Sequence, residues 1–98
     1  MDKIKIGYKI YEVEEVEPNS VLMASSEDCY GEIHYQDKKI YLNSKYDEDQ
    51  KKSTLIHEVI HGLDEMYVIE LDESQVEKLG IAITILLKDN NLKVVKNG

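Results

Sequence analysis

Apolar residues recur at two different spacings in the two halves of the chain, and this change of spacing is the feature that most limits its fold. In the second half they follow the i, i+3, i+4 pattern of a helix that packs on a core, at Leu55, Ile56, Val59, Ile60, Leu63 and Met66. Near the N-terminus, from Ile4 to Ile10, they alternate with lysine or glycine, as in a half-buried strand. The first half therefore predicts strands and the second half predicts helices.

Both predicted helices begin with the same kind of capping signal. Asp47 and Asp72 are each followed three residues later by a glutamine, which is a capping-box pattern. In the second helix five apolar residues are expected to face the core: Val76, Leu79, Ile83, Leu86 and Leu87. The run Asp89-Asn90-Asn91 predicts the end of that helix, because asparagine tolerates the left-handed conformation found at helix C-termini.

The N-terminal strand is expected to continue through Tyr11 to Glu17. The apolar spacing changes from two to three within this segment, which predicts a bulge or turn near Glu14-Glu15. Pro18-Asn19-Ser20 is a turn signal, and a short apolar segment, Val21 to Ala24, follows it.

The first half also contains a predicted hairpin. Two β-prone runs, Glu32 to Tyr35 and Lys39 to Leu42, flank the polar residues Gln36-Asp37-Lys38. The expected fold class is therefore α+β, with a small antiparallel sheet from the N-terminal half packed on two C-terminal helices. The chain has 98 residues, so residues 1–98 are expected to form a single domain.

Composition argues against several classes of partner. The formal net charge is −8, whereas phosphate binding requires clustered lysine and arginine, so we expect no nucleic-acid partner. The most apolar run, Leu79 to Leu87, is shorter than the ~20 residues that cross a bilayer, so we expect no membrane partner. Cys29 is the one cysteine, which excludes an intrachain disulfide and is typical of a reducing, intracellular compartment.

The stretch T-L-I-H-E-V-I-H-G-L-D-E, residues 54 to 65, places reactive side chains on the first predicted helix. His57 and His61 lie one turn apart on the same helix face, so both imidazoles can bind one zinc ion at about 2.0–2.1 Å. Glu58 is rotated off that line and can act as a general base toward a water that the metal activates. The alternative is a helix with two surface histidines, because H-E-x-x-H fixes only three positions.

Two histidines do not complete a zinc site, so a third ligand is required. A further histidine six residues after His61 is absent, because residue 67 is tyrosine. Asp64 lies on nearly the same helix face, and we expect it to accept a hydrogen bond from a ligand histidine. The chain is long enough to return to the histidines where the second helix begins, which favours Glu73 as the third ligand and leaves Glu77, one turn later, as the alternative.

These segments resemble a known family of metallopeptidases. T-L-I-H-E-V-I-H-G-L-D-E, followed by L-D-E-S-Q-V-E-K-L-G and an apolar helix, is similar to small gluzincin-type domains related to the ImmA/IrrE-like family, which are common in phages and mobile elements. The upstream G-E-I-H-Y-Q-D-K-K-I-Y-L-N looks like the strand pair that precedes the metal helix there. The resemblance covers roughly residues 30 to 89.

The resemblance implies a minimal zincin-like fold, with zinc held by His57, His61 and Glu73 and with Glu58 as the catalytic base. It implies a zinc-dependent endopeptidase that acts on a protein or peptide in the cytoplasm of a bacterial host cell, including phage-encoded versions. The 98 residues are expected to hold the metallopeptidase domain alone, without a further domain to recognise a substrate. The alternatives are a non-catalytic metal-binding or interaction module with the same fold, and a structural domain whose motif is accidental.

Zincins often use a tyrosine or histidine to stabilise the oxyanion. Tyr67, Tyr46 and His34 are the candidates in this sequence, although each is more simply explained as a surface or core-edge residue. The strand Lys39 to Leu42 is a candidate edge for pairing with an extended peptide.

Overall fold

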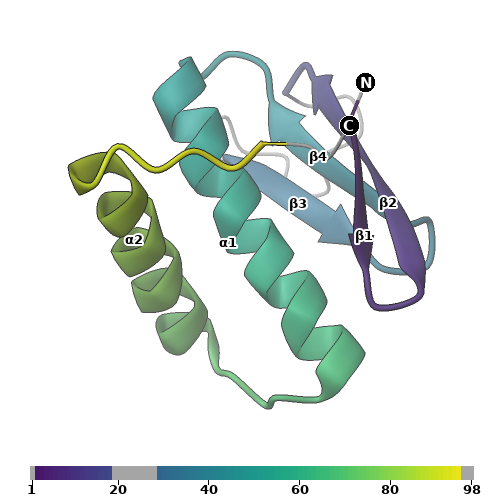
Figure 1. The fold of residues 1–98 in the computed structure, drawn as a ribbon. Helices are drawn as coiled ribbons and strands as arrows, with labels where there is room; N and C mark the ends of the chain where they lie inside the picture. The colour runs from purple at the N-terminus through teal and green to yellow at the C-terminus, as the bar shows by residue number, and fades with distance from the viewer. Residues whose placement is uncertain (1, 19–28, 96–98) are drawn as a thin grey trace.

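Figure 1 shows the computed structural model of the chain, which describes residues 2–18 and 29–95. Within these ranges four strands and two helices follow one another: β1 (Asp2–Ile6), β2 (Lys9–Val16), β3 (Gly31–His34), β4 (Lys39–Asn43), α1 (Glu48–Tyr67) and α2 (Glu73–Asp89). The predicted α+β class is confirmed. The predicted segment Val21 to Ala24, and all but the first residue of the predicted turn at Pro18-Asn19-Ser20, lie outside the described residues.

The sheet is mixed rather than antiparallel. Its strand order is β1-β2-β4-β3, and β2 runs parallel to β4 while the two outer pairs are antiparallel. The parallel pair is possible because residues 17–38, which separate β2 from β4, are long enough for a crossover connection. The prediction of an antiparallel sheet is thus wrong for this pair. Lys39 to Leu42 was the predicted edge for pairing with an extended peptide. This segment belongs to β4, which lies inside the sheet between β2 and β3.

The first predicted strand is a hairpin instead of one continuous strand. β1 and β2 pair with Ile6 opposite Lys9, so Gly7 and the residue after it form a two-residue turn. Gly7 has a φ of +61°, the left-handed conformation that glycine supplies at the first position of a type II′ turn. β2 then runs unbroken to its end, and the bulge predicted near Glu14-Glu15 does not form.

The core lies between the sheet and α1. Its most deeply buried residues are Ile6, Tyr11, Ile40 and Leu42. α1 comes close to the sheet at Gly62, where an added Cβ would lie 2.7 Å from Cδ1 of Ile6 and 3.2 Å from Cδ1 of Ile33. The predicted apolar face of α1 contributes Leu55, Val59 and Met66 to this core.

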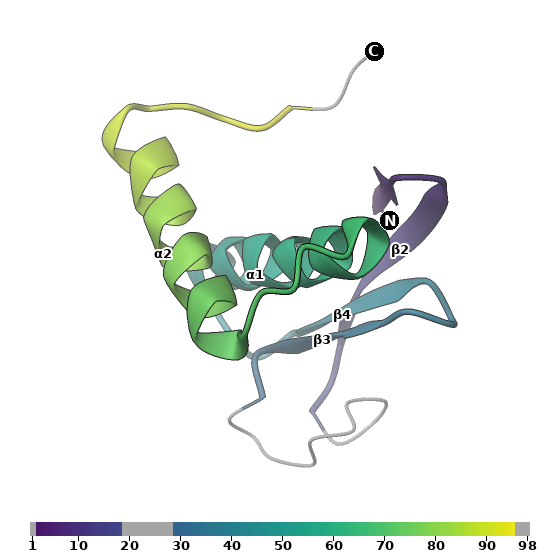
Figure 2. The ribbon, with the colours of Figure 1, turned by 90° about the horizontal axis from the view of Figure 1, so that it is seen from below.

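α2 packs beside α1 and, among the described elements, is not adjacent to any strand (Figures 1 and 2). Val76 and Gly80 form its buried side. Leu79, Ile83 and Leu86, which were expected to face the core, are 43%, 37% and 56% exposed. Because α1 separates α2 from the sheet, only one side of α2 is covered. No helix within the described ranges combines the length and hydrophobicity needed to cross a membrane.

Candidate metal centre

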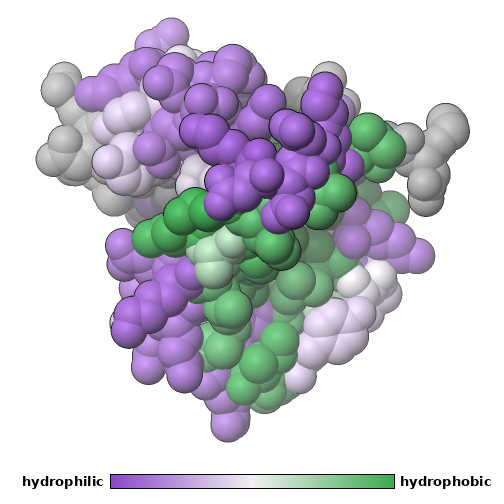
Figure 3. Space-filling model, turned by 60° about the vertical axis from the view of Figure 1, so that its left-hand side comes forward, coloured by the Kyte–Doolittle hydropathy of each residue, from purple (hydrophilic) through white to green (hydrophobic). Residues whose placement is uncertain are grey.

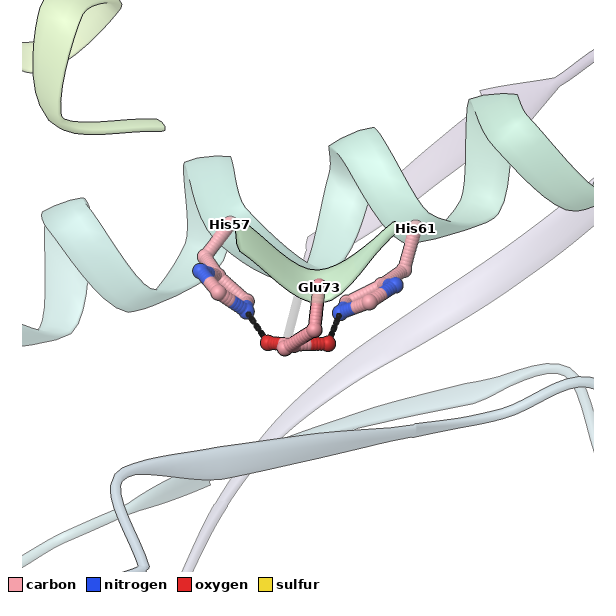
Figure 4. Close-up of side chains that lie close together, drawn as sticks. All are labelled: His57, His61 and Glu73. Carbon is pink, nitrogen blue, oxygen red and sulfur yellow. Dashed lines mark hydrogen bonds and ion pairs between the residues drawn. The ribbon is translucent and has the colours of Figure 1, made fainter. Parts of the chain in front are cut away.

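Three side chains that can bind a metal converge between α1 and the start of α2 (Figure 4). His57 and His61 project from one face of α1, with ring centroids 5.0 Å apart. The carboxylate of Glu73 lies between the two rings. Its Oε1 is 3.1 Å from Nε2 of His57, and its Oε2 is 3.1 Å from Nε2 of His61. The structure therefore brings together the two motif histidines and the glutamate that the reach of the chain favoured.

The separations of these donor atoms suit a zinc ion. One donor atom from each residue lies within 4.8 Å of the other two. In a tetrahedral site with bonds of about 2.0–2.1 Å, two ligand atoms lie about 3.3 Å apart. The two nitrogen–oxygen separations of 3.1 Å, one to each oxygen of Glu73, are of this order, so the three side chains lie close enough to share one ion. Two histidines and one carboxylate are also a donor set that catalytic zinc sites use, with a fourth position left open.

Glu73 reaches the histidines because only a short linker, residues 68–72, joins the end of α1 to the start of α2. α1 ends at Tyr67, and α2 is capped by Asp72, whose side chain accepts a hydrogen bond from the backbone N–H of Gln75. The side chain of Gln75 accepts in return from the backbone N–H of Asp72 at 2.9 Å. This complete capping box fixes the first turn of α2, and Glu73 is the first residue of that turn.

Asp64 positions the linker rather than a histidine. Its Oδ1 accepts a hydrogen bond from the backbone N–H of Leu71 at 3.0 Å, and its carbonyl accepts one from the N–H of Ile69 at 3.2 Å. Within the described residues no hydrogen bond joins Asp64 to His57 or His61, which differs from the prediction. The physical reason is competition, because the linker turns back over α1 and offers this carboxylate a backbone donor.

Glu77 lies one turn further along α2 and lines the same cleft. It is exposed, and no ion pair joins it to either histidine in the described part of the chain. The structure thus places Glu73, and not Glu77, at the histidines.

Glu58 lines the cleft from a buried position. It is 8% exposed, and its carboxyl group forms no hydrogen bond with any described residue. Burial, together with the negative charges of Glu73 and Glu32, raises the pKa of Glu58 to about 8. A carboxyl group with a pKa near neutrality is well matched to proton transfer at pH 7.

The cleft that contains these residues has a volume of about 510 Å³, within the range of small-molecule and peptide sites. α1 and α2 supply most of its lining, and the residues leading into β3 supply the rest. Asn43 is fully buried and donates a hydrogen bond from Nδ2 to the carbonyl of Cys29 at 2.9 Å. This bond fixes the segment that enters β3 against the cleft. A second hollow, of about 480 Å³, contains none of the predicted site residues.

The three oxyanion candidates are not among the described residues that line the cleft. His34 instead contacts Glu32, with 3.2 Å between Nε2 and Oε1, and Tyr67 is 61% exposed. Tyr30 does line the cleft, and its ring centroid lies 4.6 Å from that of Tyr46. Tyr30 was missed because no local signal in the sequence shows that the start of β3 approaches the metal helix.

Comparison with known proteins finds no matching family model, no matching curated protein and no matching solved structure. The resemblance to the ImmA/IrrE-like family therefore stays a prediction drawn from the motif. The candidate site is a His-His-Glu cluster beside a buried glutamate in one cleft.

Proposed function

We propose that the chain is a zinc-dependent peptidase whose metal is held by His57, His61 and Glu73. The observation that carries this proposal is the convergence of these three residues with the buried carboxyl group of Glu58 in one cleft. Structural zinc sites are closed by four protein ligands, whereas catalytic sites have three and keep one position open. Among the residues that the structure describes, the cluster has three ligands, which favours catalysis.

When bound there, zinc supplies a Lewis acid and lowers the pKa of a coordinated water to about 7. Glu58 supplies the proton acceptor. It sits one residue from His57 and within the same cleft, and no described residue occupies its carboxylate through a hydrogen bond. It can take a proton as water attacks a carbonyl carbon and return it to the amine that leaves.

An extended peptide is the substrate that the surroundings of the cleft suit best. β3 is at the edge of the sheet that the described residues form, and Gly31, its first residue, lines the cleft. An extended peptide that pairs with this edge would pass the histidines, as in other cases of strand addition to a sheet. Glu73 and Glu77 in the lining disfavour acidic peptides.

The test is cleavage of an unfolded protein and of a mixed peptide library by the zinc-loaded protein, followed by mass spectrometry. Glu58→Gln should retain zinc and lose about 10²–10⁴-fold in cleavage rate, the usual contribution of a positioned acid–base group. Glu70→Gln, the same chemical change at an exposed residue outside the cleft, is the matched control and should keep its activity.

Two results would count against this function. A Glu58→Gln variant with wild-type activity would remove Glu58 as the base. A wild-type protein that binds zinc tightly and cuts none of the library would replace the peptidase with the non-catalytic metal-binding module.

A further inference from the structure

The outer side of α2 is an apolar surface that the rest of the described chain leaves uncovered. From Leu79 to Leu87 the helix carries apolar side chains on nearly all sides, a pattern typical of a helix that is buried all round. Its buried residues, Val76 and Gly80, lie only on the side that faces α1. Figure 3, in which the α2 side of the molecule is brought forward, shows hydrophobic surface gathered in the middle of this face.

The size of this surface is above what isolated exposed side chains produce. Four large aliphatic side chains of α2 outside the cleft are between 37% and 56% exposed: Leu79, Ile83, Ile85 and Leu86. Together they expose apolar area on the order of a few hundred Å², the size at which exposed patches mark interaction sites. A partner that covers α2 is therefore expected.

The charged residues along α2 indicate what kind of partner would fit this surface. Lys78, Ala82, Ile85 and Asp89 follow one another at spacings of four, three and four residues, so they form one stripe along α2. By helical periodicity this stripe lies opposite the side formed by Val76 and Gly80. Lys78 and Asp89 are exposed, and neither forms an ion pair within the described part of the chain. The stripe thus has a positive end, a small apolar centre and a negative end.

We propose that this stripe is the interface of a homodimer in which α2 packs antiparallel on α2 of a second copy. A two-fold axis across the stripe places Lys78 of each copy at Asp89 of the other, so two opposite-charge pairs form at once. Ala82 and Ile85 then face each other between the pairs, and the small side chain of Ala82 allows close approach. A surface that is complementary to itself in this way suits a second copy of the same chain.

The net charge of −8 opposes self-association, so the two electrostatic effects must be compared. At about 0.15 M ionic strength the screening length is about 8 Å. Charges spread over the two chains are mostly further apart than this, whereas the paired Lys78 and Asp89 are in contact. The dimer should therefore form at physiological salt and weaken when the ionic strength is lowered far below it.

Charge reversal tests the pairing. Sedimentation velocity over about 1 μM to 1 mM should show a dimer for the wild type. Each single reversal, Lys78→Asp or Asp89→Lys, should raise the dissociation constant of the dimer by about ten-fold or more. The reason is that each reversal places two like-charge pairs in the interface. The double variant Lys78→Asp/Asp89→Lys should restore it, and an equimolar mixture of the two single variants should form a heterodimer. Ile85→Asp should be monomeric.

Lys52→Asp is the matched control, since it makes the same charge change at an exposed residue of α1. It should leave the dimer intact, and circular dichroism should confirm that every variant is folded. A wild type that stays monomeric over the whole range overturns the proposal. A dimer that ignores both reversals, or that the double variant fails to restore, also overturns it because the contact then lies elsewhere.

Discussion

Glu58→Gln should make the metal-free protein more stable at alkaline pH. Glu58 is buried without a hydrogen-bond partner among the described residues, and its pKa rises from 4.5 to about 8 in the folded chain. Between these two values the folded chain keeps a proton that the unfolded chain has lost. The associated stability is therefore fully present below about pH 4.5 and is lost as the pH rises through about 8.

The size of the effect follows from this difference. At 1.36 kcal/mol per pKa unit, a rise from 4.5 to about 8 corresponds to about 4–5 kcal/mol of lost stability above pH 8. Glutamine has nearly the shape of protonated glutamate and cannot ionise. The buried amide of glutamine should cost about 1–2 kcal/mol. The free energy of unfolding of the variant should therefore exceed that of the wild type by roughly 2–4 kcal/mol near pH 9. Near pH 5 the same cost should leave the variant less stable than the wild type by up to about 1 kcal/mol.

Urea unfolding in the presence of a chelator, followed by circular dichroism at about pH 5, 7 and 9, measures this difference. Glu70→Gln, an exposed glutamate, should show no change of the difference with pH. If the gap between Glu58→Gln and the wild type does not widen as the pH rises, then the Glu58 carboxylate is solvated or hydrogen-bonded in the native state. That result would contradict the burial of the Glu58 carboxyl group without a hydrogen-bond partner.

Three further substitutions test the parts that position the site. Asp64→Ala should weaken zinc binding by about ten-fold in calorimetric titration, because the N–H of Leu71 loses its acceptor, whereas Asp64→Asn keeps an oxygen there and should bind normally. Equal loss in both would indicate a role for the charge itself. Gly62→Val should cost about 1–3 kcal/mol in urea unfolding, because its Cβ would meet Ile6; an unchanged midpoint would mean that α1 lies further from the sheet. Val68→Gly should raise the melting temperature by about 4–8 °C, because Val68 has a φ of 52°, which glycine adopts without strain; no rise would show that the strain is absent.

The helices could be predicted well because their signals are local. The caps at Asp47 and Asp72 and the stop after Asp89 are set by residues within one turn of each boundary. The side of α2 that faces α1 could not be predicted in this way. Nearly every side of α2 is apolar, so periodicity does not select one, and the choice depends on Val76 and Gly80 fitting against α1.

The strands show why periodicity alone misses a hairpin. In the sequence, apolar residues continue at even positions from Ile4 to Ile10, although the two-residue turn at Gly7 and Tyr8 moves the core face to odd-numbered residues in β2. The pattern from Ile4 to Ile10 therefore looks the same for one strand or for two, and only the glycine marks the turn. The parallel pairing of β2 with β4 joins segments far apart in the chain, for which no local signal exists.

For the candidate site, the sequence was sufficient where helix geometry decides the outcome. The spacing of His57 and His61 places them on one face, and the reach of the linker favours Glu73 over Glu77. It was insufficient for Asp64, whose carboxylate has a backbone partner that only the folded linker supplies. It was also insufficient for Tyr30, which reaches the cleft through the packing of β3 against α1.

Zinc titration of the metal-free protein by calorimetry tests most directly whether His57, His61 and Glu73 form a metal site. We expect about one zinc per chain in the wild type and in Glu77→Ala. We expect a loss of affinity of more than about 100-fold in His57→Ala, His61→Ala and Glu73→Ala, since each removes a ligand rather than a supporting residue. Zinc binding that is equal in the wild type and in these three variants would contradict the metal site, and loss in Glu77→Ala alone would move the third ligand one turn along α2.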